Sequence, residues 1–213
     1  MTERYPGYDV LSKRHTPSWN EVTRRVIERR LCVPRAPRRL TPDEFALVNT
    51  LADLVTPQPD HRARIPVAAL LDERLSTDRR DGYRPPEMPR ELEAWRRGLS
   101  ALEAESRSAH GRAFNDLSRE LQQELLRKMQ HGELHHEAWR GMPPASFFSR
   151  RLLNDIVSAY WSHPTAWNEV GWGGPASPRG YVRMGYDERD PWEAAEVHGD
   201  DVAAARRRNS RVG

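Results

Sequence analysis

The 213-residue sequence contains one cysteine, Cys32, which excludes an internal disulfide and any zinc or iron–sulfur site with several cysteine ligands. Lysine is nearly absent: apart from Lys13 and Lys128, the 34 basic residues are arginines. No run approaches the roughly 18–20 apolar residues that a membrane span needs. The net charge of +3 is too balanced to indicate nucleic-acid binding by itself. Function must therefore be sought in local motifs.

Positive charge is concentrated in residues 1–40, which hold ten basic and four acidic residues. Such an arm typically lies on an acidic partner, on nucleic acid or on its own domain. Arg24-Arg25 lacks the apolar run of an export signal, and Ser149-Arg150-Arg151 lies far inside the chain. We therefore expect a cytoplasmic protein, or one that is exported only with a partner carrying the signal.

The pattern of apolar residues is helical in five stretches: after Thr41, over 66–78, from Leu92 to Leu102, after Ser118 and over about 144–161. Capping boxes at Ser18–Glu21 and Thr41–Glu44 predict helix starts, and His163-Pro164 predicts the end of the last helix, with His163 as its cap. No alternating run predicts a strand. The sequence thus predicts an all-α bundle of about six helices.

Composition divides the chain into four parts. We expect a basic arm with the first helix (1–40), a helical body (41–162) and a tail rich in glycine, proline and aromatic residues (163–197). The final part, 198–213, has little apolar content, so we expect it to be disordered.

The tail combines residues that oppose regular structure with residues that need burial. Its glycines and prolines disfavour a helix or a central strand. Its aromatic residues could cover roughly 750–1,250 Å², and one side of a standard interface is about 800 Å²; they are Trp167, Trp172, Tyr181, Tyr186 and Trp192. These rings must pack either on the chain's own helices or on another chain, and we favour a partner.

The candidate partner-binding residues are of three kinds. Aromatic side chains would act as anchors, glycines would let two backbones approach closely, and His163 and Asn168 are polar residues between them. The set is Trp161, His163, Trp167, Asn168, Gly171, Trp172, Gly173, Gly174 and Tyr181. We predict no catalytic, cofactor-binding or metal-ligating residue in this chain.

Three other motifs have alternative interpretations. Gly171–Ala176 fits a dinucleotide fingerprint, but it follows a helix and contains a proline, so it does not predict nucleotide binding. His131, His135 and His136 could hold the metal of a hydrolase, although an exposed helix end explains them better. His15–Val22 matches His163–Val170 at five positions, which indicates two similar chain-entry turns or two equivalent anchors.

The sequence resembles the gluconate 2-dehydrogenase subunit 3 family over about residues 5–195. The resemblance lies in Gly7-Tyr8-Asp9-Val10-Leu11, Pro57-Gln58-Pro59, Met142-Pro143-Pro144 with Phe147-Phe148, and above all in Tyr160–Tyr181. Many relatives begin with a twin-arginine signal, and this chain does not.

The resemblance implies a small subunit without a cofactor. Its partner would be a large flavoprotein of the glucose–methanol–choline (GMC) type, which carries FAD and oxidises a sugar, polyol or glycoside. The small subunit would assist the folding and stability of that partner, and within this model His163 or Asn168 would border the partner's substrate entrance. A cytochrome c subunit is a further candidate partner. The rival interpretation is an arginine-rich helical nucleic-acid-binding protein that uses residues 24–39 and 206–211, although 31 acidic residues oppose it.

Overall fold

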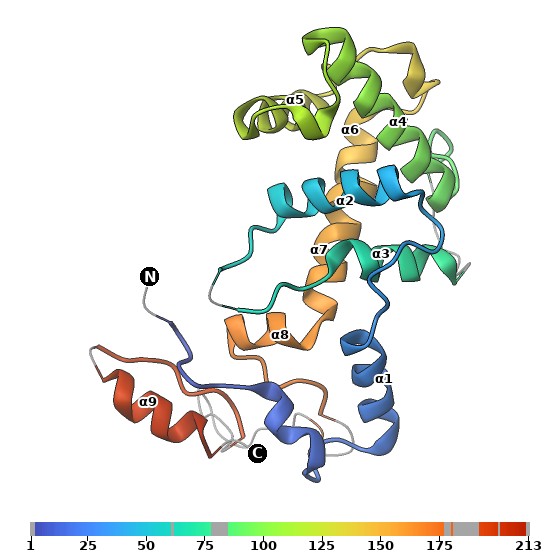
Figure 1. Ribbon diagram of the computed structural model, residues 1–213. Coiled ribbons are helices and arrows are strands. Elements are labelled where there is room, and N and C mark those ends of the chain that lie inside the picture. Colours follow the sequence, from blue (N-terminus) through green and yellow to red (C-terminus); the bar gives the residue numbers. More distant parts are fainter. Residues whose placement is uncertain are drawn as a thin grey trace. The chain divides into compact units, whose positions relative to one another are not determined.

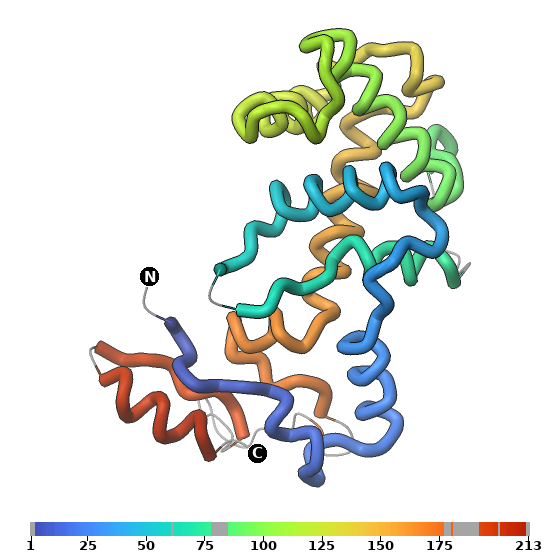
Figure 2. Tube along the Cα trace, in the orientation of Figure 1, coloured from blue at the N-terminus to red at the C-terminus, as the bar shows by residue number. Residues whose placement is uncertain are grey.

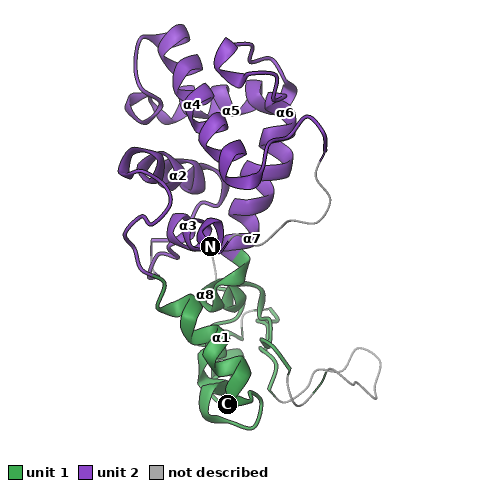
Figure 3. Cartoon of the chain, turned by 90° about the vertical axis from the view of Figure 1, so that its right-hand side faces the viewer, with its two compact units in different colours: residues 1–33, 161–213 green, residues 34–160 purple. Residues whose placement is uncertain are grey.

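The computed structural model describes residues 3–60, 62–77, 85–176, 180, 192–199 and 201–211. All regular secondary structure in these residues is helical, which confirms the predicted fold class (Figure 1). The chain forms two compact units, shown in Figure 3. Unit 2 comprises residues 34–160, and unit 1 combines residues 1–33 with 161–213. The expected arm and tail therefore belong largely to one unit.

Unit 2 is a bundle of helices joined by short 3-10 turns. Its α-helices are α2 (Pro42–Val55), α3 (Val67–Ser76), α4 (Glu91–His110), α5 (Arg119–His131), α6 (Pro144–Phe147) and most of α7 (Asn154–Ser162). The turns are η2 (Phe114–Asp116) and η3 (Glu137–Trp139). The five predicted stretches all form helices, and Thr41 and Glu44 make the predicted capping box at the start of α2.

The predicted last helix is interrupted by one wider turn. Between α6 and α7 the backbone forms a π-helical segment, η4 (Phe148–Leu153), so the path of the chain is continuous while the hydrogen-bond spacing changes (Figure 2). The buried residues of this long helix include Phe147, Leu152 and Ile156. This interruption, together with short helices in the tail, gives the described residues nine α-helices where about six were expected.

Aromatic packing fixes α4 against the segment that begins the long helix. The Phe147 ring meets Trp95 edge-on at 5.6 Å between centroids and lies 5.9 Å from Trp139. Gly98, one turn after Trp95, provides the space for that ring: a Cβ built on Gly98 would lie 2.5 Å from two Phe147 ring carbons. The core of unit 2 therefore depends on a helix position that has no side chain.

The connection into α2 is held by one carboxylate. Asp72, buried on α3, accepts the backbone N–H groups of Arg38 (2.6 Å), Arg39 (3.1 Å) and Leu40 (2.8 Å). These three consecutive donors precede Thr41, the N-cap of α2. Asp72 thus fixes the entry of the chain into this helix.

Asp72→Ala is expected to lower the free energy of unfolding by about 1–2 kcal/mol, because three backbone donors lose their acceptor where water reaches only some of them. Chemical denaturation followed by circular dichroism measures this change. Glu73→Ala, which removes the neighbouring exposed ion pair with Arg38, is the control and should change it by less than about 1 kcal/mol. Equal effects of the two variants would contradict the role of Asp72.

Unit 1 is built from both ends of the chain. Its elements are η1 (Val10–His15), α1 (Glu21–Leu31), α8 (Pro164–Trp167), η5 (Asn168–Val170) and α9 (Val202–Asn209). The N-cap of α1 is Asn20, which accepts the N–H of Thr23, so the cap lies two residues after the predicted cap Ser18.

The expectation of disorder over 198–213 is wrong for α9. Asp201 caps this helix by accepting the N–H of Ala204, and Ala205 is buried. Asn209 is also buried: its side chain donates to the carbonyls of Pro6 and Ala195 and accepts the N–H of Ala195. The hydrogen bonds of the Asn209 amide therefore help to hold α9 in place, although residues 198–213 have few apolar side chains.

Candidate partner-binding site

The first residues of the chain lie along the glycine-rich part of the tail (Figure 1). We call residues 4–13 the N-terminal strap. The Asn168 side chain accepts the N–H of Val10 at 2.9 Å and donates to Asp9 at 3.2 Å. The Tyr8 hydroxyl donates to the carbonyl of Trp172 at 3.0 Å, and Lys13 Nζ donates to the carbonyl of Gly173 at 3.0 Å. The basic arm thus packs on its own chain.

Lys13 is the residue that the sequence interpretation missed. It is fully buried, and its ammonium group also donates to the Tyr8 hydroxyl at 3.3 Å and lies 5.6 Å from the centre of the Tyr8 ring. Lysine is rarely buried to this extent unless it has partners. The available signal was compositional, because lysine occurs twice in a chain that otherwise uses arginine.

The predicted glycines are positions of close approach, but the approaching residues come from this chain. A Cβ on Gly171 would lie 2.6 Å from the Tyr5 ring, and one on Gly173 would lie 3.4 Å from Lys13 Nζ. A Cβ on Gly174 would lie 3.0 Å from both Val10 and Trp19. Gly171 and Gly174 also have positive φ angles, of 63° and 74°, which favour glycine. The glycines accommodate the strap and Trp19.

The tryptophans of the candidate site form a local cluster with a buried centre. Trp167 is 2% exposed, and its Nε1 donates to the carbonyl of Trp161 at 2.7 Å. The Trp172 ring meets Trp167 edge-on at 4.6 Å between centroids. Trp161 and Trp172 are 39% and 40% exposed, and Val170 is 50% exposed. The chain's own residues therefore cover one predicted anchor and leave two half-exposed.

His163 and Asn168 both accept backbone N–H groups of this chain. His163 is buried, and its Nδ1 accepts the N–H of Thr165 at 3.3 Å, so it caps α8, the helix that follows it. Asn168 binds the strap, whereas Asn20, its counterpart in the short sequence match, caps α1. The two matching motifs thus differ in role, although Trp19 and Trp167 are both buried.

Several predicted features lie outside the described residues. Tyr181, the last candidate anchor, and Tyr186 belong to this group, so their surroundings are not part of the description. Trp192 is described and is partly buried.

The histidine motif occupies the end of α5 and the turn after it. His131 is the last residue of α5, Gly132 caps the helix with a left-handed backbone, and His136 Nδ1 accepts the N–H of Ala138. Within the described ranges, no group of three or more histidine, cysteine, aspartate or glutamate side chains is arranged to hold a metal. Cys32 is exposed. No helix in the same ranges is long and apolar enough to cross a membrane.

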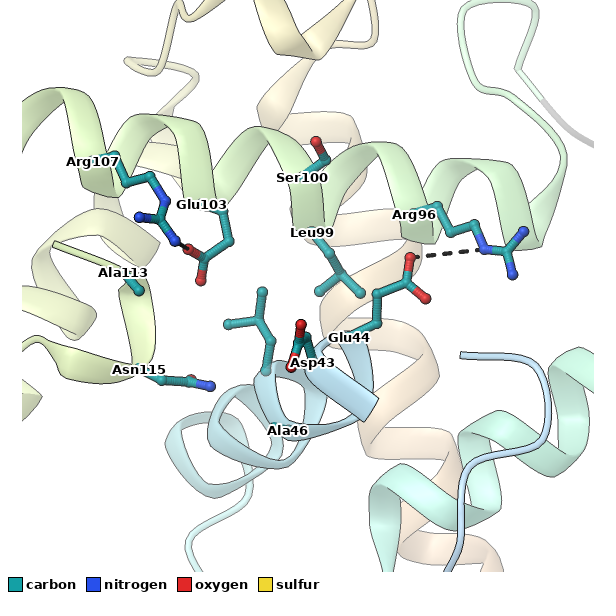
Figure 4. Close-up of a pocket in the computed structure, with 11 residues that line it drawn as sticks. Asp43, Glu44, Ala46, Arg96, Leu99, Ser100, Glu103, Arg107, Ala113 and Asn115 are labelled. Carbon is teal, nitrogen blue, oxygen red and sulfur yellow. Dashed lines mark ion pairs between the residues drawn. The ribbon is translucent and has the colours of Figure 1, made fainter. Parts of the chain in front are cut away.

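Unit 2 also carries a groove of about 470 Å³ between α2, α4 and residues 113–115 (Figure 4). Its charged side chains largely pair with one another: Arg96 lies 3.7 Å from Glu44, and Arg107 lies 3.6 Å from Glu103. Glu103 also accepts the N–H of Phe114. The Arg96–Glu44 pair and the Phe114–Glu103 hydrogen bond therefore link α4 to α2 and η2, whereas the Arg107–Glu103 pair lies within α4.

Arginines of the basic arm are engaged within the chain. Arg24 donates to the carbonyl of Trp19, Arg25 pairs with Glu21, and Arg14 pairs with Glu28. Arg30 donates to the carbonyl of Ser162 at 2.9 Å, and burial together with the neighbouring Arg29 lowers its pKa. Such contacts are typical of arginines that hold a fold and do not favour the nucleic-acid interpretation.

Comparison with known proteins adds one match. Neither the curated proteins nor the solved structures contain a match to this chain. The model of the gluconate 2-dehydrogenase subunit 3 family matches residues 42–174, which is more than half of the chain and ends at the last glycine of the candidate site. The chain therefore belongs to the gluconate 2-dehydrogenase subunit 3 family.

Proposed function

We infer that this chain is a non-catalytic accessory subunit that binds and stabilises a large FAD-dependent dehydrogenase of the GMC type. Membership of a family named for a dehydrogenase subunit supports the subunit role. The partner would carry the FAD and oxidise a sugar, polyol or glycoside. The complex would form in the cytoplasm and leave it, if at all, on a signal carried by the partner.

The half-exposed indoles of Trp161 and Trp172 carry this proposal. Tryptophan is enriched among the residues that dominate binding energy at protein interfaces, and such anchors work best in well-packed surroundings. Both indoles adjoin the buried Trp167: the Trp161 carbonyl accepts its N–H, and the Trp172 ring packs against it. A partner that covers them would complete the burial that this chain leaves partial.

Binding of this surface would stabilise the dehydrogenase by mass action. A ligand present at 100 times its dissociation constant stabilises the folded state that it binds by about 2.7 kcal/mol. An accessory subunit can thus raise the amount of folded, FAD-loaded dehydrogenase without contributing a group to the reaction.

The test is co-expression of the chain with the GMC-type flavoprotein encoded nearest to its gene. With the wild-type chain we expect a complex that co-purifies and contains FAD. The Trp161→Ala/Trp172→Ala double variant is expected to raise the dissociation constant at least about 30-fold, since one hot-spot residue contributes about 2 kcal/mol or more and the contributions of two neighbouring residues do not simply add. Isothermal titration calorimetry measures this constant, and flavin absorbance measures the FAD content.

Val22→Ala is the matched control. Val22 is 68% exposed on α1 of the same unit, and it lies outside the tryptophan cluster. This variant should bind like the wild type. The proposal is overturned if the flavoprotein folds, binds FAD and turns over equally well without this chain.

A further inference from the structure

We propose that the N-terminal strap is a positioning element for the partner-binding surface, in which Lys13 and Tyr8 fix the backbone that presents the Trp172 indole. This inference rests on the proposed function and deepens it. The family match begins at residue 42, so the strap lies outside the matched residues, yet it contacts the last residues of the match, Asn168–Gly174.

Two consecutive carbonyl groups carry the argument. The Trp172 carbonyl accepts from the Tyr8 hydroxyl at 3.0 Å, and the Gly173 carbonyl accepts from Lys13 Nζ at 3.0 Å. The Lys13 side chain is fully buried, so water does not replace its hydrogen bonds readily. A buried carbonyl that loses such a donor loses a charge-assisted hydrogen bond. The two donors therefore define the path of the chain at Trp172 and Gly173.

Trp172 is fixed at three points. Its N–H donates to the carbonyl of Trp167 at 3.0 Å, its carbonyl accepts from Tyr8, and its ring packs edge-on against Trp167. The indole is nevertheless 40% exposed. A side chain that is ordered before binding loses less conformational entropy when a partner covers it. The strap thus favours binding because it orders Trp172 in advance, and it need not contact the partner itself.

The choice of lysine at position 13 agrees with this role. Lys13 is fully buried, and its Nζ lies against Gly173, where it donates to the carbonyl at 3.0 Å and would be in ordinary van der Waals contact with a Cβ, at 3.4 Å. A compact ammonium on an unbranched stem suits this space, whereas a guanidinium is planar and wider. Lys13→Arg is therefore expected to behave like a loss of the residue, although it keeps the charge.

Hydrogen exchange on the full-length chain tests the positioning step without a partner. Tyr8→Phe removes only the hydroxyl, and Lys13→Met removes the ammonium while keeping an unbranched side chain. We expect the Trp172 amide to exchange about tenfold faster in either variant, while the amides of α5 in unit 2 keep their rates. Lys128→Met is the matched control, since Lys128 is the other lysine and forms a solvent-exposed ion pair with Glu124 on α5. It should leave the Trp172 amide unchanged.

Titration of the same variants against the GMC-type flavoprotein tests the consequence. We expect Tyr8→Phe and Lys13→Met to raise the dissociation constant about tenfold with unchanged stoichiometry. Unchanged exchange of the Trp172 amide in these variants would overturn the inference. Faster exchange with an unchanged dissociation constant would also overturn it, because the strap would then have a purely structural role. If the wild-type chain does not bind the flavoprotein, the proposed function fails instead. The exchange experiment then still decides whether the strap orders Trp172.

Discussion

Asp155→Ala is expected to lower the free energy of unfolding of this protein by about 2–4 kcal/mol. Asp155 lies fully buried on α7, where one carboxylate oxygen accepts Trp95 Nε1 at 2.9 Å and the other accepts Arg74 Nη2 at 2.8 Å. The variant leaves the buried indole N–H without its acceptor. It also removes one of two carboxylates that face Arg74, the other being Glu91.

The ion pair between Asp155 and Arg74 accounts for the electrostatic part of the lost unfolding free energy. Burial lowers the pKa of its guanidinium, but the charges of Asp155 and Glu91 outweigh burial and raise the pKa above its ordinary value. Because the Arg74 side chain is 35% exposed and keeps Glu91, the ion-pair contribution stays below that of a fully buried pair. The orphaned Trp95 donor therefore supplies much of the expected effect.

Denaturation with guanidinium chloride measures the loss, and an exposed aspartate–arginine pair provides the control. Asp53 pairs with Arg64, and their side chains are 45% and 54% exposed. Asp53→Ala should therefore cost less than about 1 kcal/mol. If both variants lower the free energy of unfolding by the same amount, then burial and the hydrogen bond with Trp95 do not explain the contribution of Asp155 to stability.

Gly98→Ala is expected to destabilise the protein by about 1–3 kcal/mol, although alanine normally stabilises a helix interior by about 1 kcal/mol relative to glycine. The reason is steric, since the new methyl group would lie 2.5 Å or less from carbons of the Phe147 ring. That ring is fully buried between Trp95 and Trp139, so it cannot move away without disturbing both contacts. Thermal unfolding followed by circular dichroism gives the sign directly.

Two further variants separate packing from helix propensity. Ser100→Ala changes an exposed residue of the same helix and should be neutral or slightly stabilising. Phe147→Leu, combined with Gly98→Ala, should cost less than the sum of the two single changes, because the smaller side chain makes room for the methyl group. Additive costs, or a stabilising Gly98→Ala, would show that the ring does not require the glycine.

Local signals in the sequence were sufficient to predict the helices of unit 2. Thr41 and Glu44 are close in sequence and form the predicted capping box, and Trp95, Leu99 and Leu102 are buried on one face as their spacing predicts. The π-helical turn at Phe148–Leu153 was not predicted, because the spacing of Phe148, Leu152 and Ile156 fits an uninterrupted α-helix, whereas the phenyl ring that is fully buried is that of Phe147.

Contacts between distant residues explain what the sequence did not reveal. Lys13 and Gly173 are 160 positions apart, and Pro6 and Asn209 are 203 apart, so no periodic pattern connects them. The glycines were predicted to let the backbone of a partner approach, whereas the atoms closest to Gly171 and Gly174 in the structure are side-chain atoms of the same chain. The α9 helix had a usable signal in Asp201 before an alanine run, which low apolar content outweighed.

Asn209 joins Pro6 to Ala195, and this has a consequence for the order of events during translation. Residues 34–160 form a unit by themselves and can fold while the ribosome is still making the rest. Residues 1–33 cannot complete unit 1 until residues 161–209 have been synthesised. A product that stops before residue 161 would keep the residues of unit 2 but would lack both indoles, of Trp161 and Trp172, that are proposed to bind the partner.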